Sequence, residues 1–281
     1  MRIVSYSTLH EDVMLYRALR NVENGFYIDV GANHPIISSI TKLFYDKGWR
    51  GINVEPLPNM FKELSKHRPE DINMYAAVSD SVGHGEIYIN PYHSGESTMH
   101  KDVMPNENVG LTIVNTVTMK EVCDEIPEGK EVHFLKIDVE GYERVVLETM
   151  DFVATRPWIV MAETHDPEWH KVWSNHWPEI YEGVEDYKAW EHILLEADYT
   201  FVHGDGANRF YVANEHSDLN EAFKYPPNCW DVYTPSELVR CRNHLLKVVS
   251  ENLNILGDSI SNSRRQELNN KFQEIVRMFQ S

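Results

Sequence analysis

The first half of the chain alternates short apolar runs with amphipathic segments, and this alternation constrains the fold more than any other feature. Apolar runs typical of buried strands cover residues 25–30, 51–54 and 72–78. The intervening stretches 38–47 and 58–67 have the spacing and N-terminal residues of helices. Strand–helix–strand units of this kind fold into parallel sheets with right-handed crossovers. The sequence therefore predicts an α/β fold.

The second half is less regular but continues the sheet. Strong apolar runs at 132–138 and 158–162 predict two buried strands, with a helix over 142–150 between them. Four shorter strands are predicted at 85–89, 112–118, 199–203 and 209–213.

The length of 281 residues suits one large domain with an appendage. We expect an N-terminal helical segment over 1–24, a main domain over 25–230 and a C-terminal helical tail over 231–281. The tail has two sets of apolar residues at heptad spacing: Leu238, Cys241, Leu245 and Val248, then Leu268, Phe272, Ile275 and Phe279. They predict two helices or one broken helix, which either pack on the main domain or form a homo-oligomer.

The net charge of −18 argues against a nucleic-acid partner, since such proteins usually present a basic face. No apolar run approaches the roughly 20 residues of a membrane span, and residues 1–10 lack the apolar core of a signal peptide. The three cysteines have no CxxC spacing. These features predict a cytoplasmic protein without an integral membrane segment.

The strongest local signal is the loop that follows the first predicted strand, at Asp29, Gly31 and Asn33. Glycine permits a tight turn and a close approach by a ligand at the edge of an α/β sheet. A dinucleotide fingerprint would need glycine also at Asn33 and Ile36. Asp29 should repel phosphate and attract a cation. A cationic ligand such as S-adenosylmethionine therefore fits better than a dinucleotide.

Two further acids end the next predicted strands. Glu55, followed by Pro56, lies at the distance from the first strand at which an acid binds the ribose hydroxyls of a nucleotide. Asp80 ends the third strand, where an adenine edge could be bound. Each acid alone is also consistent with an ordinary loop residue, but the three in order favour a cofactor site.

Candidate catalytic residues follow the two central strands. Asp138 and Glu140 share a face by strand alternation, as do Glu163 and His165. We expect His165 to act as a general base oriented by Asp138 and Glu163; Glu140 either faces the cleft or caps a helix.

A second arrangement is a Mg²⁺ site formed by Asp138, Glu163 and Asp205, which offer hard oxygen ligands. Alternatively, one of these acids simply pairs with Lys136 or Arg209.

An aromatic insertion over 165–185 carries Trp169, Trp173 and Trp177 at four-residue spacing. Flat aromatic faces bind the apolar faces of sugar rings, so Trp169 and Trp173 are candidate acceptor-binding residues. The alternative is that the tryptophans form the buried stripe of a helix.

Taken together, several motifs resemble the FkbM-type methyltransferase family. They are Phe26–Pro35, Phe44–Pro56, Ala77–Asp80, Ser97–Met99 and Leu135–Glu143. Two later stretches, Asp205–Val212 and Phe223–Asn228, resemble members associated with surface-glycan synthesis. The resemblance covers about residues 25–230 and excludes the tail.

The resemblance implies a Rossmann-like class I methyltransferase with a mostly parallel, seven-stranded sheet that uses S-adenosylmethionine to methylate a hydroxyl oxygen. The tryptophans of the insertion favour a sugar or glycan as the acceptor. By position, the resemblance assigns cofactor-binding roles to Asp29, Gly31, Asn33, Glu55, Asp80, Ser97 and Thr98; Pro56 and Asp138 are further cofactor-binding candidates. Candidate acceptor contacts are Glu140, Asp205, Asn208 and Arg209. Two rival hypotheses are an NAD-dependent sugar-nucleotide enzyme and a non-catalytic assembly partner that keeps the methyltransferase fold.

Overall fold

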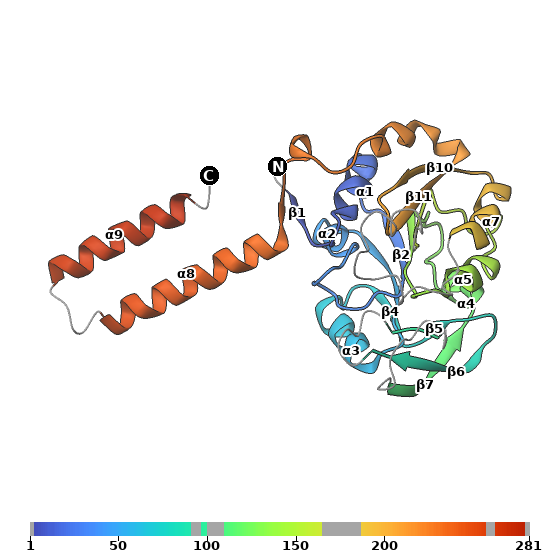
Figure 1. Ribbon diagram of the computed structural model, residues 1–281, viewed down its shortest axis with the longest axis horizontal. Coiled ribbons are helices and arrows are strands. Elements are labelled where there is room, and N and C mark those ends of the chain that lie inside the picture. The colour runs from blue at the N-terminus through green and yellow to red at the C-terminus, as the bar shows by residue number, and fades with distance from the viewer. Residues whose placement is uncertain (1–2, 91–96, 100–109, 165–186, 257–261, 279–281) are drawn as a thin grey trace, which may run out of the picture.

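The computed structural model describes residues 3–90, 97–99, 110–164, 187–256 and 262–278. An α/β body carries a helical hairpin that projects from it (Figure 1). The centre of the body is a seven-stranded sheet. In spatial order its strands are β10 (Tyr199–Gly204), β11 (Asn208–Ala213), β9 (Ile159–Glu163), β8 (Phe134–Ile137), β2 (Phe26–Val30), β3 (Arg50–Val54) and β4 (Ile72–Met74).

The sheet has the predicted mostly parallel topology. β11 runs antiparallel to β9 and β10, and the other described pairs in this sheet are parallel. The chain builds outward from β2 to β4 and then returns to β8 on the other side of β2. This reversal leaves a crevice between β2 and β8 at the carboxyl ends of the strands, where open α/β sheets bind ligands.

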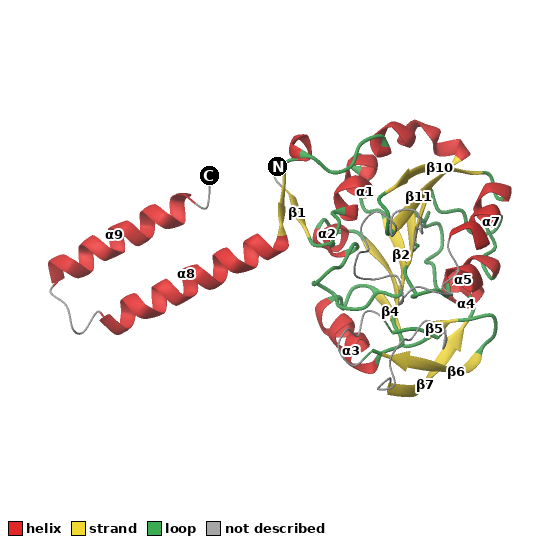
Figure 2. Cartoon of the chain, viewed as in Figure 1, coloured by secondary structure: helices red, strands yellow, loops and turns green. Residues whose placement is uncertain are grey.

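Helices flank the sheet, as Figure 2 shows. They are α1 (Glu11–Leu19), α2 (Lys42–Asp46), α3 (Pro58–His67), α4 (Met119–Asp124), α5 (Glu143–Glu148) and α7 (Glu191–Glu196), with short 3₁₀ helices at Tyr187–Ala189, Asn214–Phe223 and Cys229–Asp231. Among the described helices, none combines the length and apolar character needed to cross a membrane.

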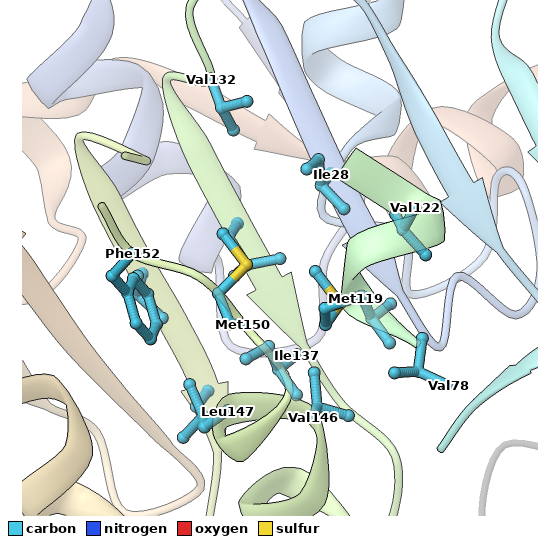
Figure 3. Packing of buried hydrophobic residues seen from close by; sticks show 14 of the residues in the cluster. Ile28, Val78, Met119, Val122, Val132, Ile137, Val146, Leu147, Met150 and Phe152 are labelled. Carbon is cyan, nitrogen blue, oxygen red and sulfur yellow. The ribbon is translucent and has the colours of Figure 1, made fainter. Parts of the chain in front are cut away.

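Strand alternation divides the core into two layers. Ile28 and Val30 of β2 face one layer, which includes residues of α4 and α5 (Figure 3). Tyr27, between Ile28 and Phe26, faces the other layer with Phe134 and α1. The central strands are buried on both faces, as expected for parallel strands covered by helices.

The predicted strand 72–78 is wrong as a single element. Residues 72–74 form β4 in the main sheet, whereas Ala77–Val78 form β5 in a second sheet with β6 (Gly83–Ile89) and β7 (Gly110–Val117). The apolar pattern continues across the break because Ala76 to Val78 remain buried in the core.

The predicted helix 38–47 begins later, at Lys42. Ser38 has a left-handed backbone, with φ of 55°, and the buried Ser39 hydroxyl accepts a hydrogen bond from Arg68. Ser38 and Ser39 therefore lie in the loop before α2 and do not cap the helix.

The N-terminal segment pairs with the segment that precedes the C-terminal helices. The N-terminal segment contains α1 and also an unpredicted strand, β1 (Ile3–Ser5), which pairs in parallel with β12 (Tyr233–Pro235). β12 leads directly into α8 (Ser236–Leu256), and α9 (Asn262–Met278) follows. The tail thus contains two helices.

Candidate functional site

A pocket lies in the crevice at the carboxyl edge of β2, β3 and β8. Its lining includes Gly31, Asn33, Glu55 and Asp138 from the strand ends. It also includes Pro56. Together with Ser97, the structure therefore brings six of the predicted cofactor residues to one pocket.

Gly31 allows the loop after β2 to pass directly over the β8 edge. Its φ is 79°, and a Cβ atom at this position would lie 1.8 Å from the backbone oxygen of Asp138. The Gly31 N–H donates to the Val54 carbonyl on the opposite side. Glycine is required here by close packing as well as by backbone conformation.

Glu55 organises the pocket wall through its carboxylate. Oε2 accepts the Asn33 N–H at 2.7 Å, and Oε1 accepts the Leu57 N–H at 2.7 Å. Burial raises the pKa of Glu55 to about 7, although the two backbone donors oppose the shift. Each carboxylate oxygen can accept a further hydrogen bond, so the group can hold both loops and still bind ligand hydroxyls.

Asp29 lies beneath the pocket and does not line it. It is buried, accepts the Thr41 hydroxyl at 2.7 Å and lies 3.1 Å from Lys136 Nζ. Lys136 Nζ also lies 3.1 Å from Asp138 Oδ2 and donates to the Gly31 carbonyl at 2.7 Å. Burial disfavours the charged ammonium, but Asp138 and Asp29 outweigh it and raise the pKa of Lys136. Asp29 thus holds Lys136, and the predicted direct attraction of a cationic ligand does not follow from its position.

One wall of the pocket is apolar. Leu57, Ala77, Ile87 and Met99 belong to a small cluster between β3 and the second sheet, and all four line the pocket. A flat, weakly polar ring fits such a wall.

The Ser97–Met99 segment contributes to the pocket in two ways. Ser97 lines it, whereas Thr98 is buried and donates its hydroxyl to the Glu140 carbonyl at 2.7 Å. Asp80, predicted on the adenine side, is exposed and lies outside the pocket lining. Its carboxylate accepts the Ser81 hydroxyl.

An acidic cluster adjoins the pocket at the ends of β8 and β9. Asp138, Glu140 and Glu163 each offer a carboxylate oxygen within 4.8 Å of the others. The Glu163 Oε2 atom is shielded from solvent and has no hydrogen-bond partner among the described residues. Burial, then the Asp138 and Glu140 carboxylates, raise the pKa of Glu163 well above its ordinary value. Burial and the neighbouring carboxylates therefore favour the protonated form of Glu163 within this cluster.

The predicted metal set included Asp205, but Asp205 is not in this cluster. It begins the turn between β10 and β11, where its carboxylate accepts the Ala207 and Asn208 N–H groups. Asn208 is buried and donates to Glu11 Oε1 at 3.2 Å. Its register partner on β9 is Glu163, so Asn208 lies close to the acidic cluster.

Arg209 is a packed structural residue in this fold. Its guanidinium carbon lies 3.7 Å from the Tyr187 ring centroid and 3.8 Å from that of Phe201. It donates to Glu191 at 2.6 Å and to the Tyr211 hydroxyl at 2.9 Å. These contacts occupy both faces and the polar edge, so the expected acceptor contact is not supported.

His165 and the tryptophans of the 165–185 insertion lie outside the described residues. The general-base assignment of His165 and the sugar-binding roles of Trp169 and Trp173 therefore remain predictions.

The site depends on positioning residues that the sequence analysis did not assign. Arg68 is fully buried and donates to Thr41 Oγ1, Ser39 Oγ and the Pro35 carbonyl. Glu143 accepts the Val139 and Gly141 N–H groups beside the acidic cluster. Lys136 is the register partner of Asp29 and precedes Asp138 by two residues, so its role in holding both acids could have been found from the sequence. Nothing in the local sequence marks Arg68.

Comparisons with solved structures give distant likenesses. The methyltransferase FkbM from Methylobacillus flagellatus KT is 14% identical, with a TM-score of 0.37, over 68% of this chain and 43% of that protein. A protein of the NADB-Rossmann superfamily from Streptococcus agalactiae is 11% identical, with a TM-score of 0.36, over 94% and 95% of the two chains. The O-methyltransferase TomG from Streptomyces achromogenes, in complex with SAM, is 11% identical, with a TM-score of 0.35, over 72% and 78%.

Likenesses this distant carry no information about the reaction, and the first spans less than half of its counterpart's length. No curated protein sequence matches the chain significantly. The match to a family model is informative: the methyltransferase FkbM domain matches residues 29–201, which is more than half of the chain and includes the pocket and the acidic cluster. The chain belongs to the methyltransferase FkbM domain family.

Proposed function

We propose that the protein is an S-adenosylmethionine-dependent O-methyltransferase that acts on a hydroxyl of a sugar or glycan. The observation that carries this proposal is the pocket at the β2–β8 crevice, because it combines a glycine crossing, a buried ribose-side acid and an apolar wall. When bound, S-adenosylmethionine supplies an electrophilic methyl group. Family membership supports the same reaction class.

The residues present fit this cofactor. Glu55 would accept hydrogen bonds from the ribose hydroxyls, and the wall around Leu57, Ile87 and Met99 would contact the adenine. Asn33 Oδ1 is buried without a hydrogen-bond partner among the described residues, which suits a group that receives a donor from the ligand. Lys136 would hold Asp138 in place at the boundary with the acceptor side.

The acceptor hydroxyl must lose its proton as the new bond forms. His165 remains the proposed base; in the sequence it follows Glu163 by two positions. A divalent cation is a second arrangement, supported by the convergence of Asp138, Glu140 and Glu163 and by the unpartnered Oε2 of Glu163. Such a cation would lower the hydroxyl pKa. Glu140 thus replaces Asp205 in the proposed ligand set.

Calorimetric titration with S-adenosylhomocysteine and, separately, NAD tests the cofactor assignment. We expect binding of the first and no binding of NAD, because the loop lacks glycine at Asn33 and Ile36. Binding of NAD alone would overturn the proposal in favour of the sugar-nucleotide enzyme.

Transfer of labelled methyl from S-adenosylmethionine to isolated cell-surface glycans and their precursors tests the acceptor. His165→Ala should retain cofactor binding and lose turnover. Cofactor binding without transfer to any of these acceptors would favour the assembly partner. Full activity in EDTA would exclude the chelatable-cation arrangement while leaving the methyltransferase assignment intact.

A further inference from the structure

The projecting hairpin has an apolar stripe that the rest of the described chain does not cover. α8 and α9 contact one another and extend away from the α/β body (Figures 1 and 2). On α8, Leu238, Leu245 and Val248 are 61%, 48% and 37% exposed, and Cys241 is also exposed. The spacing of these four residues is that of heptad positions a, d, a and d.

A second apolar face on α8 is already used within the hairpin. Val239, Leu246 and Val249 are half-buried, as are Leu268 and Phe272 on α9. The two faces of α8 are offset by one residue, which is about 100° around a helix. A helix with two apolar faces at this angle is typical of a bundle in which it has two neighbours. α9 supplies one neighbour, whereas the face with Leu238 and Leu245 is exposed in the part of the chain that the structure describes.

We propose that the missing neighbour is α8 of a second copy of this chain, so that two hairpins form a four-helix bundle. On α9, the side chains that the structure describes, other than Leu268 and Phe272, are exposed and polar: Arg264, Gln266, Glu267, Asn269, Asn270, Lys271 and Gln273. Among the described side chains of the hairpin, the α8 stripe is therefore the apolar surface that a second copy would contact.

Charge complementarity selects a parallel, in-register pairing. Beside the stripe, Glu237 occupies position g and also lies 3.0 Å from Arg240 of its own chain. Arg242 occupies position e and donates to Asn243. Parallel helices bring each g residue next to the e residue of the following heptad on the partner, so Glu237 would meet the partner's Arg242 twice across the symmetric contact. Antiparallel helices would place Arg242 near the partner's Arg242 and Glu237 near the partner's Glu251, which repel.

In a parallel pair, Cys241 at position d would also lie opposite the partner's Cys241.

Light scattering of the full chain during size-exclusion chromatography tests the dimer. We expect twice the monomer mass of 32.7 kDa. Leu245→Glu should give a monomer with an unchanged far-UV spectrum, because it places a carboxylate at the centre of the contact. Val153→Glu is the matched control, since Val153 is 95% exposed on the body, and it should remain dimeric. A monomeric wild type, or a dimeric L245E variant, would overturn the proposal.

Disulfide trapping tests the orientation. In a Cys229→Ser background, mild oxidation should link Cys241 to the partner's Cys241, and adding Cys241→Ser should abolish the link. Glu237→Arg and Arg242→Glu should each weaken the dimer at least tenfold, and the double exchange should restore it. A dimer that does not crosslink through Cys241, or that the double exchange fails to restore, would overturn the parallel register. None of these readouts depends on methyl transfer.

Discussion

The two halves of the carboxyl edge differ in how their carboxyl groups are held. On the β2–β3 side, both oxygens of Glu55 accept backbone N–H groups and Asp29 contacts Lys136 and Thr41, although Asn33 Oδ1 is buried without a hydrogen-bond partner among the described residues. On the β8–β9 side, three carboxyl groups converge and Glu163 Oε2 has no hydrogen-bond partner among the described residues. Donors of the chain itself therefore hold the acids of the proposed cofactor pocket, whereas the proposed acceptor half gathers acids close to one another.

The largest expected effect concerns the buried hydrogen bonds that hold the loop beside the proposed cofactor pocket. Arg68→Met removes a fully buried guanidinium that holds Pro35, Ser39 and Thr41. Since loss of one member of a buried charged network leaves its partners unsatisfied, we expect urea unfolding to show a loss of about 3–5 kcal/mol. The control Arg144→Met removes an exposed pair with Glu148 and should cost less than about 0.5 kcal/mol. Equal losses of unfolding free energy in the two variants would contradict the structural role proposed for the buried Arg68.

Gly31→Ala tests whether the pocket requires close contact as well as an unusual backbone. Gly48 is the matched control, because its φ of 89° resembles the 79° of Gly31 but no atom of the described residues lies within 4 Å of the place that a Cβ would take. We expect G31A to weaken S-adenosylhomocysteine binding about 100-fold, or about 3 kcal/mol. G48A should leave affinity unchanged, as measured by calorimetry. Similar affinities in the two variants would contradict the close-contact explanation.

Glu55→Gln should produce a moderate loss of stability. Both carboxylate oxygens accept N–H groups, so the amide NH₂ of glutamine must face a donor. We expect a cost of about 2 kcal/mol in thermal or urea unfolding. The exposed Glu128 provides a control whose change to glutamine should have no measurable effect. A neutral outcome for E55Q would mean that the pocket is less constrained than its hydrogen bonds indicate.

Glu163→Gln should have the smallest effect and the opposite sign. Because burial and neighbouring carboxylates raise the folded-state pKa of Glu163, the stability contributed by its protonated form is present below the unfolded pKa of about 4.5 and is lost as pH rises toward the folded value. Glutamine removes this loss, so E163Q should gain about 1 kcal/mol at neutral pH and show a flatter stability profile between pH 5 and 8. The exposed Glu196→Gln is the control. Destabilisation of E163Q would contradict the conclusion that burial and neighbouring carboxylates disfavour the charged form of Glu163.

Strand identity was predictable because periodicity reflects burial directly. The runs around Ile28, Ile52 and Leu135 became β2, β3 and β8. The same signal failed at 72–78, since apolar residues on either side of a sheet change look alike when both are buried. Likewise, Ser38 and Ser39 match a helix cap by type, but a distant residue, Arg68, holds that stretch as a loop.

Residue types and strand ends sufficed to place Gly31, Glu55 and Asp138 at one edge, since a parallel sheet gathers its carboxyl ends whatever the side-chain details. The sequence also determined the acidic character of the adjoining half. Only the tertiary structure decided which acids lie close together. Glu140 lies with Asp138 and Glu163, whereas the Asp205 carboxylate accepts a hydrogen bond within its own turn. The tertiary structure alone showed that Asp29 forms an ion pair with Lys136. The reason is physical: a local pattern fixes the face toward which a side chain points, but charge pairing depends on separations of a few ångströms between segments that are far apart along the chain.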